Sequence, residues 1–135
     1  MCTALLPSVV VCRSAQRVLY LRKPLSAVFA GGELGFVERE QPAGAGSDPA
    51  NVVDFGYPIG SIQVPGGVEP IVLMNDAVTG GGYATIGTVI SVDRDTLAQT
   101  KTNDKTRFRS VDLEEALEAR KQRWQKMEEI RQSLS

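Results

Sequence analysis

Residues 61–74 read SIQVPGGVEPIVLM, two short apolar runs separated by a Pro-Gly-Gly sequence. Each run is rich in β-branched or other apolar residues and is bounded by turn formers, which is typical of a strand. The intervening residues 65–67 favour a tight change of chain direction. We therefore predict a β-hairpin formed by residues 61–64 and 70–74, and with it a mainly β fold.

Further strands are expected on the C-terminal side of this hairpin. Residues 86–92 form a β-branched run, and residues 105–111 place Phe108 between Arg107 and Arg109, in the alternation of a half-buried strand. The core is therefore expected to consist mostly of strands.

On the N-terminal side, residues 34–38 also read as a strand. Residues 41–51 are almost all Pro, Ala, Gly, Ser and Asp. Such a composition has few side chains that bury surface, so we predict a mobile loop there.

The hydrophobic period changes to that of a helix in residues 112–135. Asp112 followed by Glu115 provides a start similar to a capping box. Five large apolar side chains fall on one helical face. They are Leu113, Leu117, Trp124, Met127 and Leu134. We predict a C-terminal amphipathic α-helix that packs on its own domain or, alternatively, binds a partner.

Composition excludes several functional classes. The chain has 135 residues, 42% hydrophobic and 23% charged, which predicts a soluble protein with one domain. A net charge of -1 argues against nucleic-acid binding, and the apolar runs are too short to cross a membrane. The absence of histidine excludes Ser-His-Asp and Cys-His catalysis and histidine-ligated zinc, and no metal site is evident. Cys2 and Cys12 do not suggest a disulfide framework, which favours the reducing cytoplasm.

The first 32 residues contain Arg13, Arg17, Arg22 and Lys23 but no acidic residue. Three interpretations remain: an organelle transit peptide, a pair of ordinary strands, or a truncated upstream region. We therefore divide the chain into a leader of uncertain structure (1–33), a β domain (34–111) and the helix (112–135).

The segment 79–83, Thr-Gly-Gly-Gly-Tyr, is the candidate centre of function. Three glycines without Cβ atoms let backbone amides approach an anion or a planar amide, and Thr79 and Tyr83 add hydroxyl groups. Asp76 is a candidate base. The alternative is a plain hairpin turn in which glycine provides positive φ. The segment is not a Walker A loop, because no Gly-Lys-Ser/Thr follows it.

Gln63 is a polar residue between Ile62 and Val64 on the first strand of the hairpin. Alternation points its side chain away from their face. There it either reads an amide or ureido group with its donor and acceptor, or simply faces water.

Several ordered motifs resemble the carboxyltransferase-domain family. Its members include allophanate hydrolase subunit 2, the C subunit of the ATP-dependent 5-oxoprolinase, and a domain of urea carboxylase. The motifs are residues 58–66, 70–76, 79–83, 86–90, 97–99, 107–109 and 113–116. The resemblance covers roughly residues 34–120 and corresponds to the C-terminal half of the family only. The family's N-terminal half, with its Gln-Asp-Leu-Gly motif, has no counterpart here.

The resemblance implies a cyclophilin-like β-barrel, partial in this chain, that acts with a second subunit of similar fold. It implies a component of an ATP-dependent amidohydrolase or carboxyltransferase system of the 5-oxoprolinase or allophanate hydrolase type. The substrate would be a small cyclic amide or ureido compound. ATP would act at the level of the complex, and biotin is a candidate cofactor. The alternatives are a non-enzymatic regulator that antagonises an inhibitor of a histidine kinase, and an inactive fragment. The edges of a half barrel also favour pairing with another chain, a homo-oligomer included.

The family motif implies a pocket at matching positions of this sequence. The implied catalytic residues are Asp76, Gln63 and Thr79. The implied substrate-binding residues are Pro65, Gly66, Gly81, Gly82 and Tyr83. The common family run Asp-Arg-Gln-Thr-Thr-Gly-Gly-Tyr-Pro is replaced here by residues 76–84, DAVTGGGYA, so an Arg, a Gln and a Thr are lost. This replacement leaves the identity of the substrate open.

Overall fold

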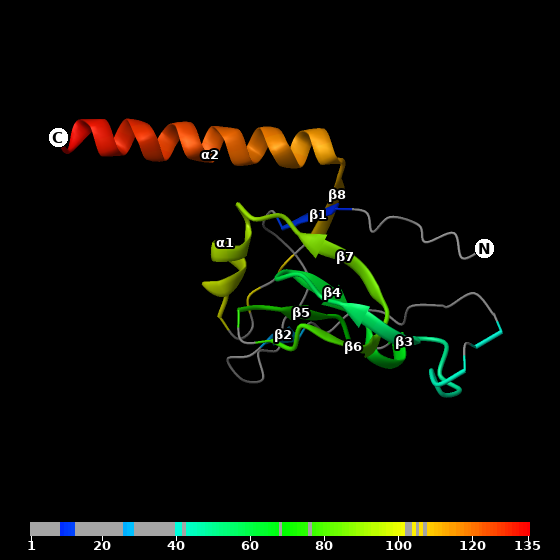
Figure 1. Ribbon diagram of the computed structural model, residues 1–135. Coiled ribbons are helices and arrows are strands. Elements are labelled where there is room, and N and C mark those ends of the chain that lie inside the picture. The colour runs from blue at the N-terminus through cyan, green and yellow to red at the C-terminus, as the bar shows by residue number, and fades with distance from the viewer. Residues whose placement is uncertain are drawn as a thin grey trace.

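The computed structural model describes residues 9–12, 26–28, 40–41, 43–67, 69–75, 77–101, 104, 106 and 108–135, with the backbone alone at 9–12 and 26–28. Figure 1 shows a body of strands with a small helix at one side and a long C-terminal helix across one end. This arrangement confirms the prediction of a mainly β fold with a C-terminal helix.

In the described part of the chain, eight strands form a six-stranded sheet of order β2-β5-β4-β7-β1-β8 and a two-stranded sheet of β3 and β6. Their bounds are β1 Val9–Cys12, β2 Ser26–Val28, β3 Asn51–Gly56, β4 Ser61–Gln63, β5 Ile71–Leu73, β6 Gly80–Tyr83, β7 Thr85–Val89 and β8 Phe108–Val111. The helical elements are η1 Pro65–Gly67, α1 Arg94–Ala98 and α2 Leu113–Ser133. Among the described residues the outer strands β2 and β8 do not pair with each other, so no closed barrel is present there.

The predicted hairpin is confirmed. β4 and β5 pair antiparallel, with Ile62 opposite Val72. The turn between them uses Gly66 and Gly67 at φ +58° and +71°, where glycine avoids the steric cost of a side chain. The N–H of Gly67 donates to the carbonyl of Val64 at 3.1 Å and closes the turn.

Gly60 is required where the chain enters β4. Its φ is +95°, and a Cβ there would lie 2.8 Å from the carbonyl oxygen of Val89. The N–H of Gly60 donates to Leu73 O at 2.7 Å, and its carbonyl accepts from Val89 N at 2.8 Å. This single residue therefore connects the start of β4 to both neighbouring strands.

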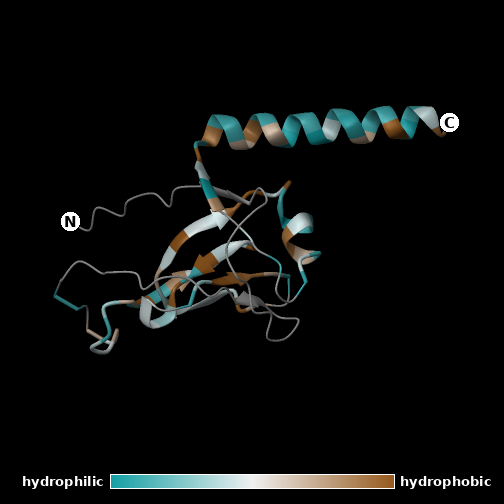
Figure 2. Ribbon diagram, turned by 180° about the vertical axis from the view of Figure 1, so that it is seen from behind, coloured by the Kyte–Doolittle hydropathy of each residue, from teal (hydrophilic) through white to brown (hydrophobic). Residues whose placement is uncertain are grey.

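The main core lies on one face of the six-stranded sheet. Ile62, Val72 and Val89 pack there with Leu97 from α1, and Phe108 packs against them. Burying each of these side chains contributes roughly 1.5–3 kcal/mol. The hydrophobic colouring of these strands is visible in Figure 2.

The first 33 residues contribute two strands to this sheet. β1 lies between β7, to which it is parallel, and β8, to which it is antiparallel. β2 pairs antiparallel with β5 at the opposite side of the sheet. Of the three interpretations of the leader, this pairing agrees with a pair of strands.

Some predicted boundaries differ from the structure. β7 ends at Val89 because the chain turns at residues 91–93, and β8 begins only at Phe108. The strand predicted at residues 34–38 and Arg107 lie outside the described residues.

The predicted mobile loop at residues 41–51 is partly wrong. Ala45 and Ala50 are buried, the latter with 0% of its surface exposed. Asp48 organises the segment, because its carboxylate accepts from Ala50 N at 2.8 Å and its carbonyl from Asn51 N at 3.0 Å. Small side chains pack closely there, and strand β3, which the sequence did not predict, begins directly afterwards.

Helix α2 begins as predicted, after Asp112, whose side chain accepts the N–H of Glu115 at 2.8 Å. The face that docks is different from the one predicted. Ala116 and Ala119 pack against Ile90 and Val111. The large apolar side chains of the predicted face remain exposed, and the C-terminal part of the helix extends beyond the sheet (Figure 1). In the part of the chain that the structure describes, no helix has the length and apolarity needed to cross a membrane.

Candidate functional site

The glycine segment is a strand and not a turn. Gly80–Tyr83 form β6, which pairs antiparallel with β3, Gly81 lying opposite Phe55 and Gly80 opposite Gly56. The glycines of β6 do not have positive φ, since the described positive-φ glycines are all elsewhere. The interpretation as a hairpin turn built on positive φ is therefore wrong.

Close packing explains two of these glycines. A Cβ on Gly81 would lie 3.2 Å from the ring of Tyr57, and one on Gly82 would lie 3.1 Å from the carbonyl oxygen of Val52. Both distances are shorter than an ordinary van der Waals contact. The absence of side chains lets an aromatic ring and a neighbouring strand approach the backbone of β6 directly.

Tyr57 holds this strand in place, and sequence reasoning missed it. Its side chain is buried, and its hydroxyl donates to Tyr83 O and accepts from Tyr83 N, each at 2.8 Å. Its own N–H donates to Thr79 O at 2.8 Å, just before β6 begins. Tyr57 therefore binds the chain at both ends of β6. The only signal in the sequence was an aromatic residue beside the Pro58 turn.

Gln63 is buried, with 5% of its surface exposed, and the expectation that it faces water is wrong. β4 is central in the sheet, so Gln63 lies between Ile71 of β5 and Thr85 of β7. Its amide is not among the buried side-chain groups that lack a hydrogen-bond partner in the described part of the chain. The donor and acceptor of a buried amide need polar partners, and a substrate with matching polar groups provides them.

An irregularity in strand pairing occurs at this residue. Ile62 pairs with Gly87 but Gln63 pairs with Thr85, which leaves Ile86 as the extra residue of a bulge. Bulges re-aim side chains and are frequent beside functional sites.

The end of β4 also contacts the residue that follows the glycine strand. The N–H of Val64 donates to Ala84 O at 3.2 Å, and Ala84 N donates to Ala50 O at 2.7 Å. Gln63 and the Tyr83 end of β6 are thus neighbours, although they are far apart in the sequence.

The remaining predicted residues divide into three groups. Pro65 and Gly66 follow β4 directly, in η1, and Gly66 is exposed. Thr79 is exposed and contributes its backbone carbonyl to Tyr57. Asp76 lies outside the described residues. The structure therefore brings Gln63, Pro65 and Gly66 toward the Tyr83 end of the glycine strand.

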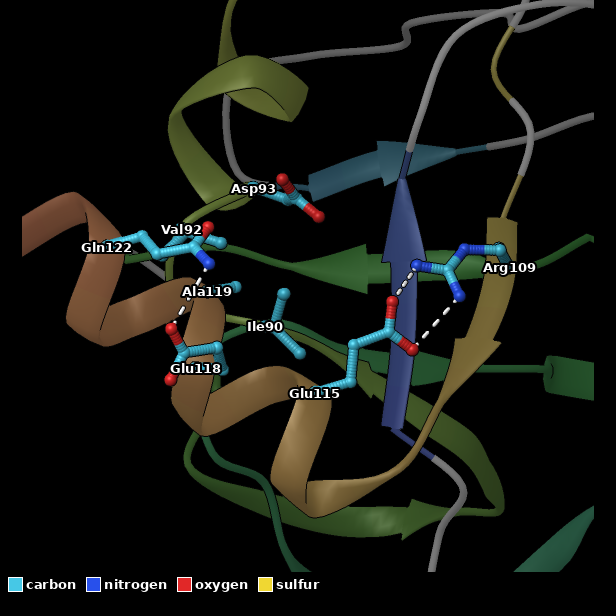
Figure 3. Close-up of a pocket in the computed structure, with 8 residues that line it drawn as sticks. All are labelled: Ile90, Val92, Asp93, Arg109, Glu115, Glu118, Ala119 and Gln122. Carbon is cyan, nitrogen blue, oxygen red and sulfur yellow. Dashed lines mark hydrogen bonds and ion pairs between the residues drawn. The ribbon is translucent and has the colours of Figure 1, made fainter.

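A separate cavity of about 280 Å³ lies beneath the first turns of α2. Figure 3 shows Arg109 of β8 and Glu115 of α2 facing each other across it, joined by two hydrogen bonds, one of them 3.0 Å. The hydrogen bonds to Glu115 raise the pKa of Arg109. None of the predicted site residues lines this cavity, and the pairing of its charges favours a role in attaching the helix.

Residues 17–110 match the family model described as carboxyltransferase domain, subdomain A and B. This chain belongs to the carboxyltransferase-domain family. The match begins earlier than the resemblance at residues 34–120 indicated, and it includes β2. It ends before α2.

Curated relatives match parts of this carboxyltransferase domain. It is 37% identical over 83 residues to the 5-oxoprolinase C subunit of Haemophilus influenzae, which covers 62% of this chain and 27% of the relative. It is 44% identical over 71 residues to the 5-oxoprolinase C subunit of Escherichia coli, covering 53% of this chain and 23% of the relative. It is 37% identical over 75 residues to a putative urea carboxylase of Emericella nidulans, covering 56% of this chain and 6% of the relative. The matched part is thus about a quarter of the length of the two 5-oxoprolinase relatives.

Proposed function

We propose that this chain is a component of an ATP-dependent amidohydrolase or carboxyltransferase system, of the type that converts 5-oxoproline to glutamate or hydrolyses allophanate. Membership of the carboxyltransferase-domain family supports the class, and the names of two relatives support the 5-oxoprolinase type. The observation that carries the site is the burial of Gln63, a residue with an amide side chain, at the bulge between β4 and β7.

The chemistry of Gln63 suits such a substrate. Its side chain has a carbonyl acceptor and an NH₂ donor, the complement of the C=O and N–H of a lactam or a ureido group. Hydrogen bonds in a water-poor site discriminate strongly between ligands. A ligand without the matching polar group leaves the buried amide unpaired.

The glycine strand would provide the second wall of the pocket. Among the residues that the structure describes, β6 pairs with β3 alone, so alternate backbone groups point away from that partner. The hydrogen bonds from Tyr57 to Tyr83 hold this strand still. We propose that free amides near Gly81 and Gly82 stabilise negative charge that develops on the carbonyl oxygen of the substrate.

The proposed cofactors follow from the same chemistry. The ureido ring of biotin has the donor and acceptor pattern that Gln63 matches, and this match supports biotin as a candidate cofactor. The sequence has no Walker A motif, and we propose that ATP binds in another part of the complex.

The test is an assay of ATP-dependent conversion of 5-oxoproline to glutamate by the chain mixed with candidate partner subunits. Gln63→Leu keeps the volume but removes both polar groups, and we expect turnover to fall about tenfold or more. Gln99→Leu changes an exposed residue in the same way and should leave turnover unchanged.

Unchanged turnover in Gln63→Leu and in Gly81→Val would remove this pocket from consideration. The second candidate is a non-enzymatic binding module. Binding of 5-oxoproline or of partner subunits, measured by calorimetry without turnover in any mixture, would support that alternative.

A further inference from the structure

The exposed side of α2 carries a regular seam of seven positions spaced four and three residues apart, as in a coiled coil. The seam consists of Leu113, Leu117, Arg120, Trp124, Met127, Arg131 and Leu134. Trp124 is 67% exposed and Leu134 is 83% exposed. The family match ends at residue 110, so the family model does not account for this surface.

A different side of the helix attaches it to the sheet. Ala116 and Ala119 pack against the body, and Arg123 donates to Val92 O at 3.0 Å and pairs with Asp95. At about 100° per residue, these positions are turned away from the line through Leu117 and Trp124. Leu117 and Trp124 are therefore available while α2 stays docked. Met127 and Leu134 lie nearly in line with Ala116 along the helix but are exposed in its C-terminal part.

Two hollows lie along the seam, between α2 and the body. One, of about 400 Å³, is lined by Trp124 and Met127 together with Ser91 and Arg120. The other, of about 270 Å³, includes Leu117 and again Ser91 and Arg120. Since the two share residues, they form one continuous trough beside the helix.

The charges in this trough are incompletely paired. Arg94 lines the second hollow and Arg120 lines both, and neither forms an ion pair with any residue that the structure describes. Arg131 is already held by Glu128, at 2.8 and 3.0 Å. The trough therefore suits an apolar segment that ends in negative charge.

We propose that α2 pairs in antiparallel orientation with α2 of a second copy of this chain, seam against seam. In the register that aligns the apolar positions of the two seams, Trp124 contacts Met127 of the second copy and Leu117 contacts Leu134 of the second copy. Because the arrangement is two-fold symmetric, each contact occurs twice. The large apolar side chains from Leu117 to Leu134 then pair with one another.

Charge complementarity favours this register. Lys121 and Glu128 flank the seam on the same side, and the antiparallel register places Lys121 opposite Glu128 of the second copy, twice. Arg120 comes level with Arg131 of the second copy, whose charge is balanced by its own Glu128. The C-terminal carbonyls of the second helix, which carry partial negative charge, then lie near Arg120 and Arg94.

The parallel orientation lacks these contacts. It would place Lys121 level with Lys121 of the second copy and about 10 Å along the axis from Glu128, at 1.5 Å per residue. It would also bring both sheets to the same end of the helix pair. A self-complementary seam is the property expected of a contact between identical chains, which selects a second copy over an unrelated helix.

The test is a charge swap followed by sedimentation equilibrium on the full chain. We expect the wild type to be a dimer. Lys121→Glu and Glu128→Lys should each raise the dissociation constant at least about tenfold, because each places like charges together twice. The double variant should again be a dimer, and a mixture of the two single variants should form a heterodimer.

Matched controls separate this effect from changes in helix stability. Lys126→Glu and Glu129→Lys make the same charge changes on the side of α2 away from the seam, and dimerisation should persist in both. Circular dichroism at 222 nm checks that every variant keeps its helix.

Three outcomes would overturn the proposal. They are a wild type that stays monomeric up to about millimolar concentration, a dimer that both single variants leave intact, and failure of the double variant to recover. Capture of a different helix by a monomeric chain falls under the first outcome. None of these results bears on Gln63, so this proposal fails or stands independently of the proposed function.

Discussion

The hydroxyl of Tyr57 is hydrogen-bonded to both backbone polar groups of Tyr83, donating to its carbonyl and accepting from its N–H, each at 2.8 Å. The two residues are 26 positions apart in the sequence, and one side chain satisfies both backbone groups of Tyr83. The buried phenol of Tyr57 therefore adds to the pairing with β3 in placing the glycine strand.

Replacing Tyr57 by phenylalanine should destabilise the protein by about 1–3 kcal/mol, because two backbone groups lose their partner while the ring stays. Urea denaturation measures this as a lower midpoint at unchanged slope. Tyr83→Phe is the control, since the hydrogen bonds to Tyr57 use only the backbone of Tyr83. Equal midpoints for the two variants would contradict the assigned role.

Gly81→Ala should be more costly than Gly56→Ala, although both residues lie in the same two-stranded sheet. The added Cβ at Gly81 would lie 3.2 Å from the Tyr57 ring, whereas at Gly56 nothing lies within 4 Å. We expect Gly81→Ala to cost about 1–3 kcal/mol from overpacking and Gly56→Ala to be close to neutral. Differential scanning calorimetry of both variants checks the order, and a larger loss for Gly56→Ala would refute it.

The contact between Arg123 and Asp95 should make the docking of α2 sensitive to acid. The hydrogen bond from Arg123 lowers the pKa of Asp95 from its ordinary value of 3.8. Stability from this pair is therefore fully present above pH 3.8 and is lost as the pH falls through the lower pKa of the folded state.

The stability of the wild type should accordingly fall more steeply below pH 3.8 than that of Asp95→Asn, which cannot release or bind this proton. Urea midpoints measured between neutral and acidic pH test this. Glu129→Gln alters an exposed carboxylate of α2 without touching the contact and should follow the wild type. Parallel curves for the wild type and Asp95→Asn would show that the pair does not contribute.

Local patterns predicted much of the fold. The hairpin of β4 and β5 follows from two apolar runs around Pro65-Gly66-Gly67, and the start of α2 follows from Asp112 and Glu115. Each depends on residues close together in the chain, where spacing and propensity carry the information. The resemblance to carboxyltransferase domains likewise rested on ordered motifs, and the family match confirms it.

The candidate site was predicted less completely. Gln63 was selected by its residue type, but its burial depends on strands on both sides of β4. Glycine content alone favoured a turn at Gly80–Tyr83, because glycines disfavour strands, and pairing with β3 overrides that preference. Tyr57 was missed, because nothing in its own neighbourhood reveals the strand that it binds.

The amino-acid sequence alone therefore determines the family, the hairpin and the capped C-terminal helix, since these depend on interactions over a few residues or on motif order. The folded chain alone settles which face of α2 docks, how Gln63 is enclosed, and that Tyr57 binds Tyr83. These features are contacts between segments that are distant in the sequence. They form, and contribute to stability, only when the strands have assembled. Ala116 and Ala119 are the helix residues that pack against Ile90 and Val111, whereas Trp124 remains exposed.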